Sequence, residues 1–162
     1  MTKRKMRFFL ITLLLLLAGC GKAEREGLTV YSFSGENDRI TVFNGVIVLN
    51  GEEGTFYGGN LKAEGEEFSD IVSRSTKFYV LSGDGENAIC SDRVEDTSGG
   101  TIQVSGDLGK LSGDILGRLK TDDENDLKNS LFFELVATDR SGETCTYQLQ
   151  MILKEVTREA SE

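Results

Sequence analysis

The chain has 162 residues, with 18 Lys and Arg, 27 Asp and Glu, 3 Cys and no His, Pro or Trp. The lack of histidine excludes Ser-His-Asp and Cys-His catalysis and imidazole metal ligands. A net charge of −9 argues against nucleic-acid binding, because phosphates are recognised by a basic surface. The length suits one domain that buries roughly two-thirds of the surface exposed by its unfolded chain.

The N-terminal segment is typical of an export signal. Four basic residues, Lys3, Arg4, Lys5 and Arg7, precede an uncharged and mostly apolar stretch over 8–18. That stretch is shorter than the roughly 20 residues of a membrane-spanning helix, so we expect a cleavable signal helix over 1–19. It ends in Leu17-Ala18-Gly19-Cys20, and bacterial lipoprotein processing requires a cysteine at this junction. We therefore expect acylation of Cys20; the alternative is an ordinary secretory signal with an incidental cysteine.

Acylation predicts a lipid-anchored protein on the extracytoplasmic face of the cell membrane, since two acyl chains hold a protein stably on a bilayer. Removal of 1–19 takes four basic residues and no acidic one, which leaves 14 basic and 27 acidic residues, a net charge of −13. The lipidated cysteine and a short tether occupy 20–27, and such a tether spans roughly 15 Å as a flexible coil. Because bacterial membranes are usually anionic, we expect this acidic domain to be held off the surface.

Two cysteines remain after lipidation of Cys20. Cys90 and Cys145 both lie in strand-like segments, and an exported chain meets oxidising conditions. We favour a disulfide between them over two separate buried thiols, because cross-sheet neighbours would have suitable geometry. The bond would close a loop of about 55 residues and contribute on the order of 4 kcal/mol.

Alternating apolar residues predict strands through most of the mature chain. The clearest signal is Asn44-Gly45 between the β-branched runs 40–43 and 46–49, which is the preferred sequence of a two-residue hairpin turn. Four apolar residues would then face the core: Ile40, Val42, Ile47 and Leu49.

A second pair of strands is predicted at 131–138 and 144–155, on either side of a polar turn. In the later strand, alternate apolar residues share one face, which predicts a sheet with one dry and one wet side. Those residues are Cys145, Tyr147, Leu149, Met151 and Leu153.

Altogether, about eight to ten short strands separated by frequent turns predict an all-β fold, an antiparallel β-sandwich. A partly closed β-barrel is the alternative, because periodicity does not show whether edge strands meet. We expect a single β domain over 28–156 and a frayed tail over 157–162.

Several segments resemble small uncharacterised lipoproteins of Firmicutes. They are Tyr31-Ser32-Phe33-Ser34-Gly35-Glu36-Asn37, Asn44 to Leu49, Phe56-Tyr57-Gly58-Gly59 with Leu61, Leu131 to Leu135, and Thr138 to Gly142. The resemblance covers most of the mature chain. It implies a cell-envelope location and a β-rich fold, and it carries over no functional residue.

An acidic run provides the best candidate for a metal site. Asp122, Glu124 and Asp126 place oxygen ligands at alternating positions, as at the start of a calcium loop. An EF-hand is excluded, because its glycine position holds Leu127 and its glutamate position holds Phe133. A weaker Ca²⁺ site remains an alternative to a solvated acidic loop, which is the more common role of such runs.

No recognisable catalytic motif is present, so we expect a non-enzymatic binding or structural module of the cell envelope. Its partner would be a protein, a wall polymer or a small ligand, with no cofactor. The alternatives are a hydrolase that uses carboxylates alone or with a metal, and a calcium-stabilised module. Acid pairs such as Asp92 and Glu95 are numerous, and their spacing alone selects none as catalytic.

Overall fold

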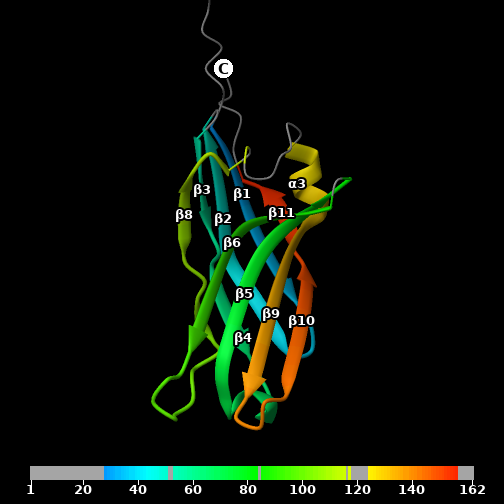
Figure 1. The fold of residues 1–162 in the computed structure, drawn as a ribbon. Coiled ribbons are helices and arrows are strands. Elements are labelled where there is room, and N and C mark those ends of the chain that lie inside the picture. Colours follow the sequence, from blue (N-terminus) through cyan, green and yellow to red (C-terminus); the bar gives the residue numbers. More distant parts are fainter. Residues whose placement is uncertain (1–27, 51–52, 84, 116, 118–123, 157–162) are drawn as a thin grey trace, which may run out of the picture.

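The protein is an antiparallel β-sandwich (Figure 1). The computed structural model describes residues 28–50, 53–83, 85–115, 117 and 124–156. Two antiparallel sheets face each other and do not close into a barrel, which confirms the predicted all-β sandwich. No helix within these ranges has the length and apolar character needed to cross a bilayer.

The larger sheet, sheet A, has the main order β11-β1-β2-β3-β8, with β4 and β7 beside this path. Its strands are β1 (Thr29–Glu36), β2 (Ile40–Asn50), β3 (Glu53–Tyr57), β4 (Asn60–Ala63), β7 (Gly106–Asp107), β8 (Lys110–Gly113) and β11 (Ile152–Glu155). Sheet B has the order β10-β9-β5-β6. Its strands are β5 (Ile71–Ser82), β6 (Gly85–Glu95), β9 (Leu131–Asp139) and β10 (Thr144–Gln150). A 3₁₀ turn (Glu66–Phe68) precedes β5, and helix α3 (Glu124–Ser130) precedes β9.

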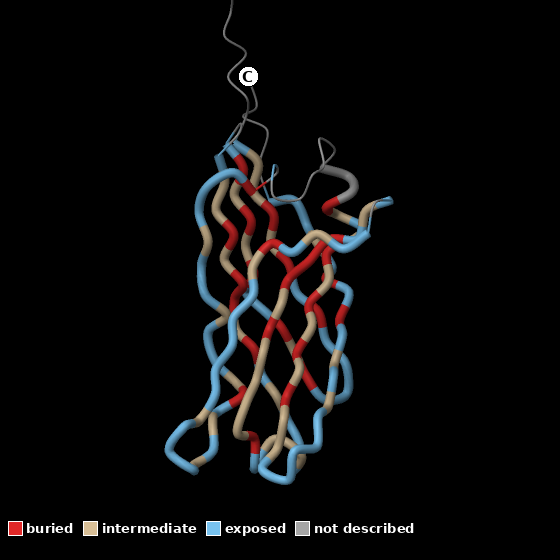
Figure 2. Tube along the Cα trace, in the orientation of Figure 1, coloured by how far each residue is buried: buried red, intermediate tan, exposed pale blue. Residues whose placement is uncertain are grey.

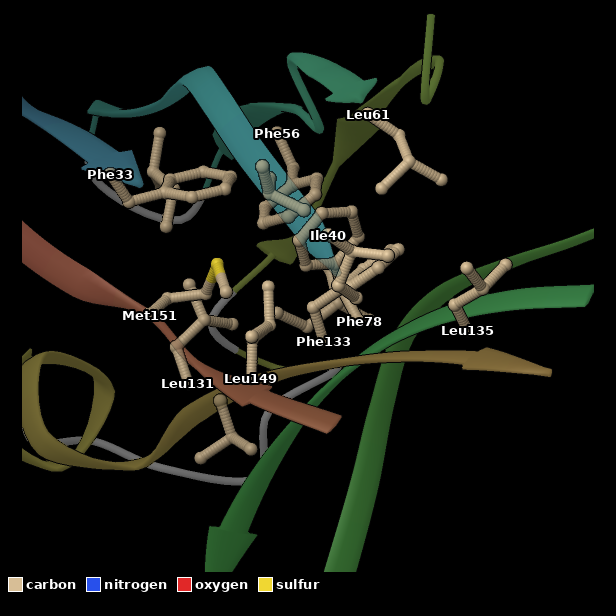
Figure 3. Packing of buried hydrophobic residues seen from close by; sticks show 14 of the residues in the cluster. Phe33, Ile40, Phe56, Leu61, Phe78, Leu131, Phe133, Leu135, Leu149 and Met151 are labelled. Atoms are coloured by element: carbon tan, nitrogen blue, oxygen red, sulfur yellow. The ribbon is translucent and has the colours of Figure 1, made fainter. Parts of the chain in front are cut away.

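Four phenylalanine rings join the two sheets at the centre of the core (Figure 3). Phe33 and Phe56 come from sheet A and lie 5.4 Å apart between ring centroids. Phe78 of sheet B lies 5.0 Å from Phe56 and 4.9 Å from Phe133 of the same sheet. Along the strands, buried and more exposed residues alternate (Figure 2), because successive side chains of a strand point to opposite faces.

The Asn44-Gly45 hairpin prediction is wrong. β2 continues through these residues as one strand, and its neighbour changes from β4 before them to β3 after them. Asn44 has φ 59°, so the pair forms a kink in place of a turn. A second kink lies directly opposite, where a Cβ on Gly59 would be 2.2 Å from the Phe43 carbonyl oxygen. The four residues predicted to face the core are nevertheless all buried.

For the strand predicted at 144–155, the buried face is correct, but the structure divides the run into two strands, β10 and β11. Leu149 and Met151 are buried on the predicted dry side, and Tyr147 and Leu153 pack against the core. The strand is interrupted at Met151, whose N–H donates to the Leu131 carbonyl at 2.9 Å. Before this point β10 pairs with β9 in sheet B, and after it β11 pairs with β1 in sheet A. One run of residues therefore connects both sheets.

Candidate functional site

A hollow in the described part of the chain lies between β6 and the β7–β8 segment. β6 is the last strand of sheet B, and β8 ends the main path of sheet A on the same side of the molecule (Figure 1). The groove between them has a volume of about 430 Å³. A second hollow of about 360 Å³ continues past Ala88 and Ile89 and shares Cys90, Ser91 and Leu111 with the first. We call the two together the β6–β8 groove.

The groove has an apolar floor, to which both sheets contribute. Phe78 reaches it from β5 and is buried, while Leu108 and Leu111 pack against the core from the opposite side. On β6, Cys90 lies opposite Phe78 and Asp92 lies opposite Thr76 in the strand register. Alternation along the two strands therefore directs all four of these side chains toward the space between the sheets.

Polar groups line the rim of the groove. The Tyr57 hydroxyl donates to Asp107 at 2.7 Å, and the Gly109 N–H donates to the same carboxylate at 2.6 Å. The hydrogen bond from Tyr57 is the main cause that lowers the pKa of Asp107. The Asp107 carboxyl is therefore ionised at neutral pH. With Asp92 and Lys110, the rim carries two carboxylates and one ammonium group.

Two glycines allow the rim to approach sheet A closely. The Gly58 N–H donates to the Gly109 carbonyl at 2.9 Å, and the Leu108 N–H donates to the Gly59 carbonyl at the same distance. A Cβ on Gly58 would lie 2.8 Å from the Leu108 Cβ, so a larger residue there would push the loop away. The sequence indicated a turn at these glycines, whereas in the structure they dock the loop that lines the groove.

The half-buried Cys90 thiol faces the groove but is poorly suited to nucleophilic chemistry. Burial is the main cause that raises its pKa, to about 11. The thiol therefore stays protonated at neutral pH, and a protonated thiol is a weak nucleophile.

The disulfide predicted between Cys90 and Cys145 is not formed, and both cysteines are free. Cys90 lies on β6 and Cys145 on β10, at opposite edges of sheet B with β5 and β9 between them. Three strand spacings alone separate them by about 14 Å across the sheet, and the register adds an offset along the strands, because Cys145 lies level with Val94. A disulfide needs Cα atoms within about 7 Å. Both cysteines do lie in strands of one sheet, as expected, but not in neighbouring strands.

The remaining predicted site residues lie largely outside the described residues. This is so for Cys20 and Asp122, and for the side chains of Glu124 and Asp126, whose backbone forms the start of α3. Within the described ranges, no group of three or more His, Cys, Asp or Glu side chains is placed to hold a metal ion.

The structure brings only one member of the Asp92 and Glu95 pair to the groove. Asp92 faces the groove, while Glu95 lies an odd number of residues along β6 and so on the other face. Asp107 joins Asp92 at the groove from the opposite sheet. Sequence reasoning missed this pair because the two carboxylates come from strands that no local pattern places together.

A separate row of polar residues crosses the outer face of sheet B. Gln148 donates to Glu134 at 2.8 Å, and the Lys77 ammonium lies 3.3 Å from Glu134 and 2.7 Å from Glu86. The hydrogen bond from Gln148 is the main cause that lowers the pKa of Glu134. The hydrogen bond to Glu86 is the main cause that raises the pKa of Lys77. Because its members bind one another, this row connects four strands and is not an open site.

Comparison of the chain with protein families, with curated proteins and with solved structures finds no match.

Proposed function

We propose that this chain is a lipid-anchored, extracytoplasmic binding module that takes an extended peptide segment of a partner protein into the β6–β8 groove and catalyses no reaction. The observation that carries the proposal is the position of the groove between two edge strands. Among the described strands, β6 pairs only with β5, and β8 pairs only with β3.

Edge strands favour a peptide over a compact ligand. The free edge of a strand has backbone N–H and C=O groups without strand partners, and an extended peptide can pair with them. Alternate side chains of such a peptide would enter the groove above Phe78, Leu108 and Leu111. Two carboxylates against one ammonium at the rim favour a peptide with a basic residue.

Anchoring rests on the sequence around Cys20, and the lack of catalysis rests on the chemistry of the groove. The groove contains no histidine, because the chain has none. Its thiol has a raised pKa, and its Asp107 carboxylate already accepts hydrogen bonds from Tyr57 and Gly109. These features support binding better than acid–base or nucleophilic catalysis.

Site-specific crosslinking in intact cells tests the peptide proposal. A photo-reactive amino acid replaces Asp92, which is exposed and faces the groove, in the full-length chain. The control places it at Thr146, which is exposed on β10 at the other edge of sheet B. We expect covalent adducts with a single partner protein from the Asp92 position alone, reduced by Asp107→Asn, and the crosslinked segment should contain a basic residue. Equal adducts at both positions, or none at Asp92, would contradict the proposal.

A further inference from the structure

The two free strand edges beside the β6–β8 groove differ in length (Figure 1). β6 runs over 11 residues, whereas β8 has 4. The backbone of β6 also reaches the groove: Ser91 lines both hollows, although alternation places its side chain on the other face of the strand from that of Asp92. A peptide in the groove therefore finds the longer free edge on β6.

The hydrogen bonds between β5 and β6 show which backbone groups of β6 are directed to this edge. The Asp96 N–H donates to the Val72 carbonyl at 2.8 Å, and the strand register, continued by one residue, places the two directly opposite each other. Opposite residues that exchange hydrogen bonds alternate along an antiparallel ladder with residues that do not. Asp92 therefore bonds to β5, whereas the backbone N–H and C=O groups of Arg93 and Ser91 are directed away from it. Among the described residues, neither of these two forms a backbone hydrogen bond with a loop or turn.

The same pattern follows from the far side of sheet B. The Asp139 N–H donates to the opposite Glu143 carbonyl at 2.9 Å, so the odd-numbered residues of β9 bond to β10 and the even-numbered ones to β5. Lys77 lies opposite an even-numbered residue of β9 and thus bonds to that strand. This leaves Thr76 to bond to Asp92, its partner on β6.

Charged and apolar side chains are separated along the groove. Asp92, Asp107 and Lys110 line the first hollow, whereas none of the residues that line the second hollow is charged. Cys90 and Leu111 belong to both. Because Cys90 and Asp92 are two residues apart on β6, they mark an apolar and an acidic position on the same face of one strand.

We infer that the peptide joins sheet B as a strand antiparallel to β6 and carries a basic residue two positions before an apolar one, an inference that rests on the proposed function. Residues opposite each other in a ladder point to the same side of a sheet. The basic residue would lie opposite Asp92, with Asp107 across the groove, and the apolar residue opposite Cys90, beside Leu111. The residue between them would lie opposite Ser91 and exchange backbone hydrogen bonds with it.

The direction and the choice of strand both have a structural reason. All strand pairs among the described residues are antiparallel, and antiparallel ladders are slightly more stable per residue than parallel ones. On β8, Leu111 packs against the core, Lys110 and Ser112 alternate with it, and Gly113 has no side chain. A peptide paired with β8 would therefore have no acidic neighbour on that strand.

Selection from a displayed library of random octapeptides tests the inference. The full-length chain, reconstituted in vesicles, is the bait. We expect the wild type to enrich peptides that carry a lysine or arginine two positions before an apolar residue. Asp92→Asn should remove the preference for the basic residue. Glu95→Gln neutralises an acid of the same strand that faces away from the groove, so it is the matched control and should leave the preference unchanged.

Synthetic copies of an enriched peptide, each with one N-methylated backbone amide, test the register. Methylation of the residue between the basic and the apolar one should weaken binding about tenfold, because it removes the hydrogen bond to the Ser91 carbonyl. Methylation of the basic residue should have little effect, since its N–H points away from β6. Fluorescence anisotropy measures both affinities, and the reverse order of effects would overturn the antiparallel register.

The outcomes separate this inference from the proposed function. Peptides whose binding depends on Asp92 but which lack the basic and apolar residues at this spacing would overturn the inference and leave the groove as a peptide site. Peptides that bind the wild type and Asp92→Asn equally, or no enrichment over empty vesicles, would overturn both. Circular dichroism of each variant establishes that it is folded.

Discussion

At the scale of single residues, the contact between Gly45 and Phe33 determines how the sheets meet. A Cβ on Gly45 would lie 2.1 Å from a carbon of the Phe33 ring, so the ring occupies the space that any side chain would need. Phe33 in turn contacts Phe56 and Phe78, which belong to different sheets. The glycine therefore leaves the space that the aromatic core needs, while the positive φ of the kink in β2 belongs to the neighbouring Asn44.

We expect Gly45→Ala to destabilise the fold by about 1–3 kcal/mol, because the added methyl group must displace a packed ring. Gly83→Ala is the matched control: nothing lies within 4 Å of its Cβ position, so its effect should stay within about 0.5 kcal/mol. Urea denaturation measures both. Equal losses from the two substitutions would show that the Phe33 contact has no special weight.

The residue pattern around Asn44 could not distinguish a hairpin from a kink. A two-residue hairpin turn places Val42 and Ile47 on one face, because they become cross-strand partners. In a continuous strand they would point to opposite faces, but one inserted residue at the kink returns them to the same face. The buried face was therefore predictable from the sequence, while the path of the chain was not. The decisive contact is with Gly59, whose place opposite the kink depends on the pairing of β4 with β2.

At the scale of elements, the polar row on sheet B connects strands that are distant in the sequence. Glu134 on β9 contacts Gln148 on β10 and Lys77 on β5. Strand order decides these contacts, and periodicity contains no information about strand order. For the same reason, the sequence identified Cys90 and Cys145 as strand residues but placed them side by side, and it could not bring Asp92 and Asp107 to one groove.

Glu134→Gln should lower the free energy of unfolding by about 1 kcal/mol at pH 7, since its partly buried contacts with Lys77 and Gln148 are weakened. The pKa of Glu134 is lowered in the folded state. The ionised carboxylate therefore stabilises the fold at pH values above the ordinary pKa of glutamate, and this stabilisation is lost as the pH falls through the lowered pKa of the folded state. The difference between the wild type and the variant should therefore be smaller at pH 3 than at pH 7.

Urea denaturation at the two pH values provides the measurement. Thr146→Ser, on the same outer face but outside the polar row, serves as the control and should show no such pH dependence. A difference between wild type and Glu134→Gln that is the same at both pH values would indicate that the charge of Glu134 is not what stabilises the row.

At the scale of the whole molecule, the two ends of the described chain meet. β1 lies between β2 and β11, so the first and last strands are direct neighbours. Leu28 and Val156 therefore lie at the same end of the sandwich, where the Val156 N–H donates to the Val30 carbonyl at 2.8 Å. The overall β-sandwich was predictable from composition and alternation, but this meeting of first and last strands depends on the crossing at Met151, which interrupts an otherwise regular pattern.

Cys20→Ala should move the protein from the membrane fraction to the soluble fraction, because the acylated thiol is the proposed attachment. Cys145→Ala removes a different cysteine and should leave the protein membrane-bound. Cell fractionation followed by immunoblotting measures both. Retention of Cys20→Ala in the membrane fraction after a high-salt wash would contradict lipid anchoring.

The position of β1 also has a mechanical consequence. A pull between the proposed partner and the proposed anchor at Cys20 would load β1 from its N-terminal end, along the strand. Because β1 is hydrogen-bonded on both sides, to β2 and to β11, such a load would shear two ladders at once and would not open them one bond at a time. With that anchor, the strand nearest the attachment would be one that is held on both sides.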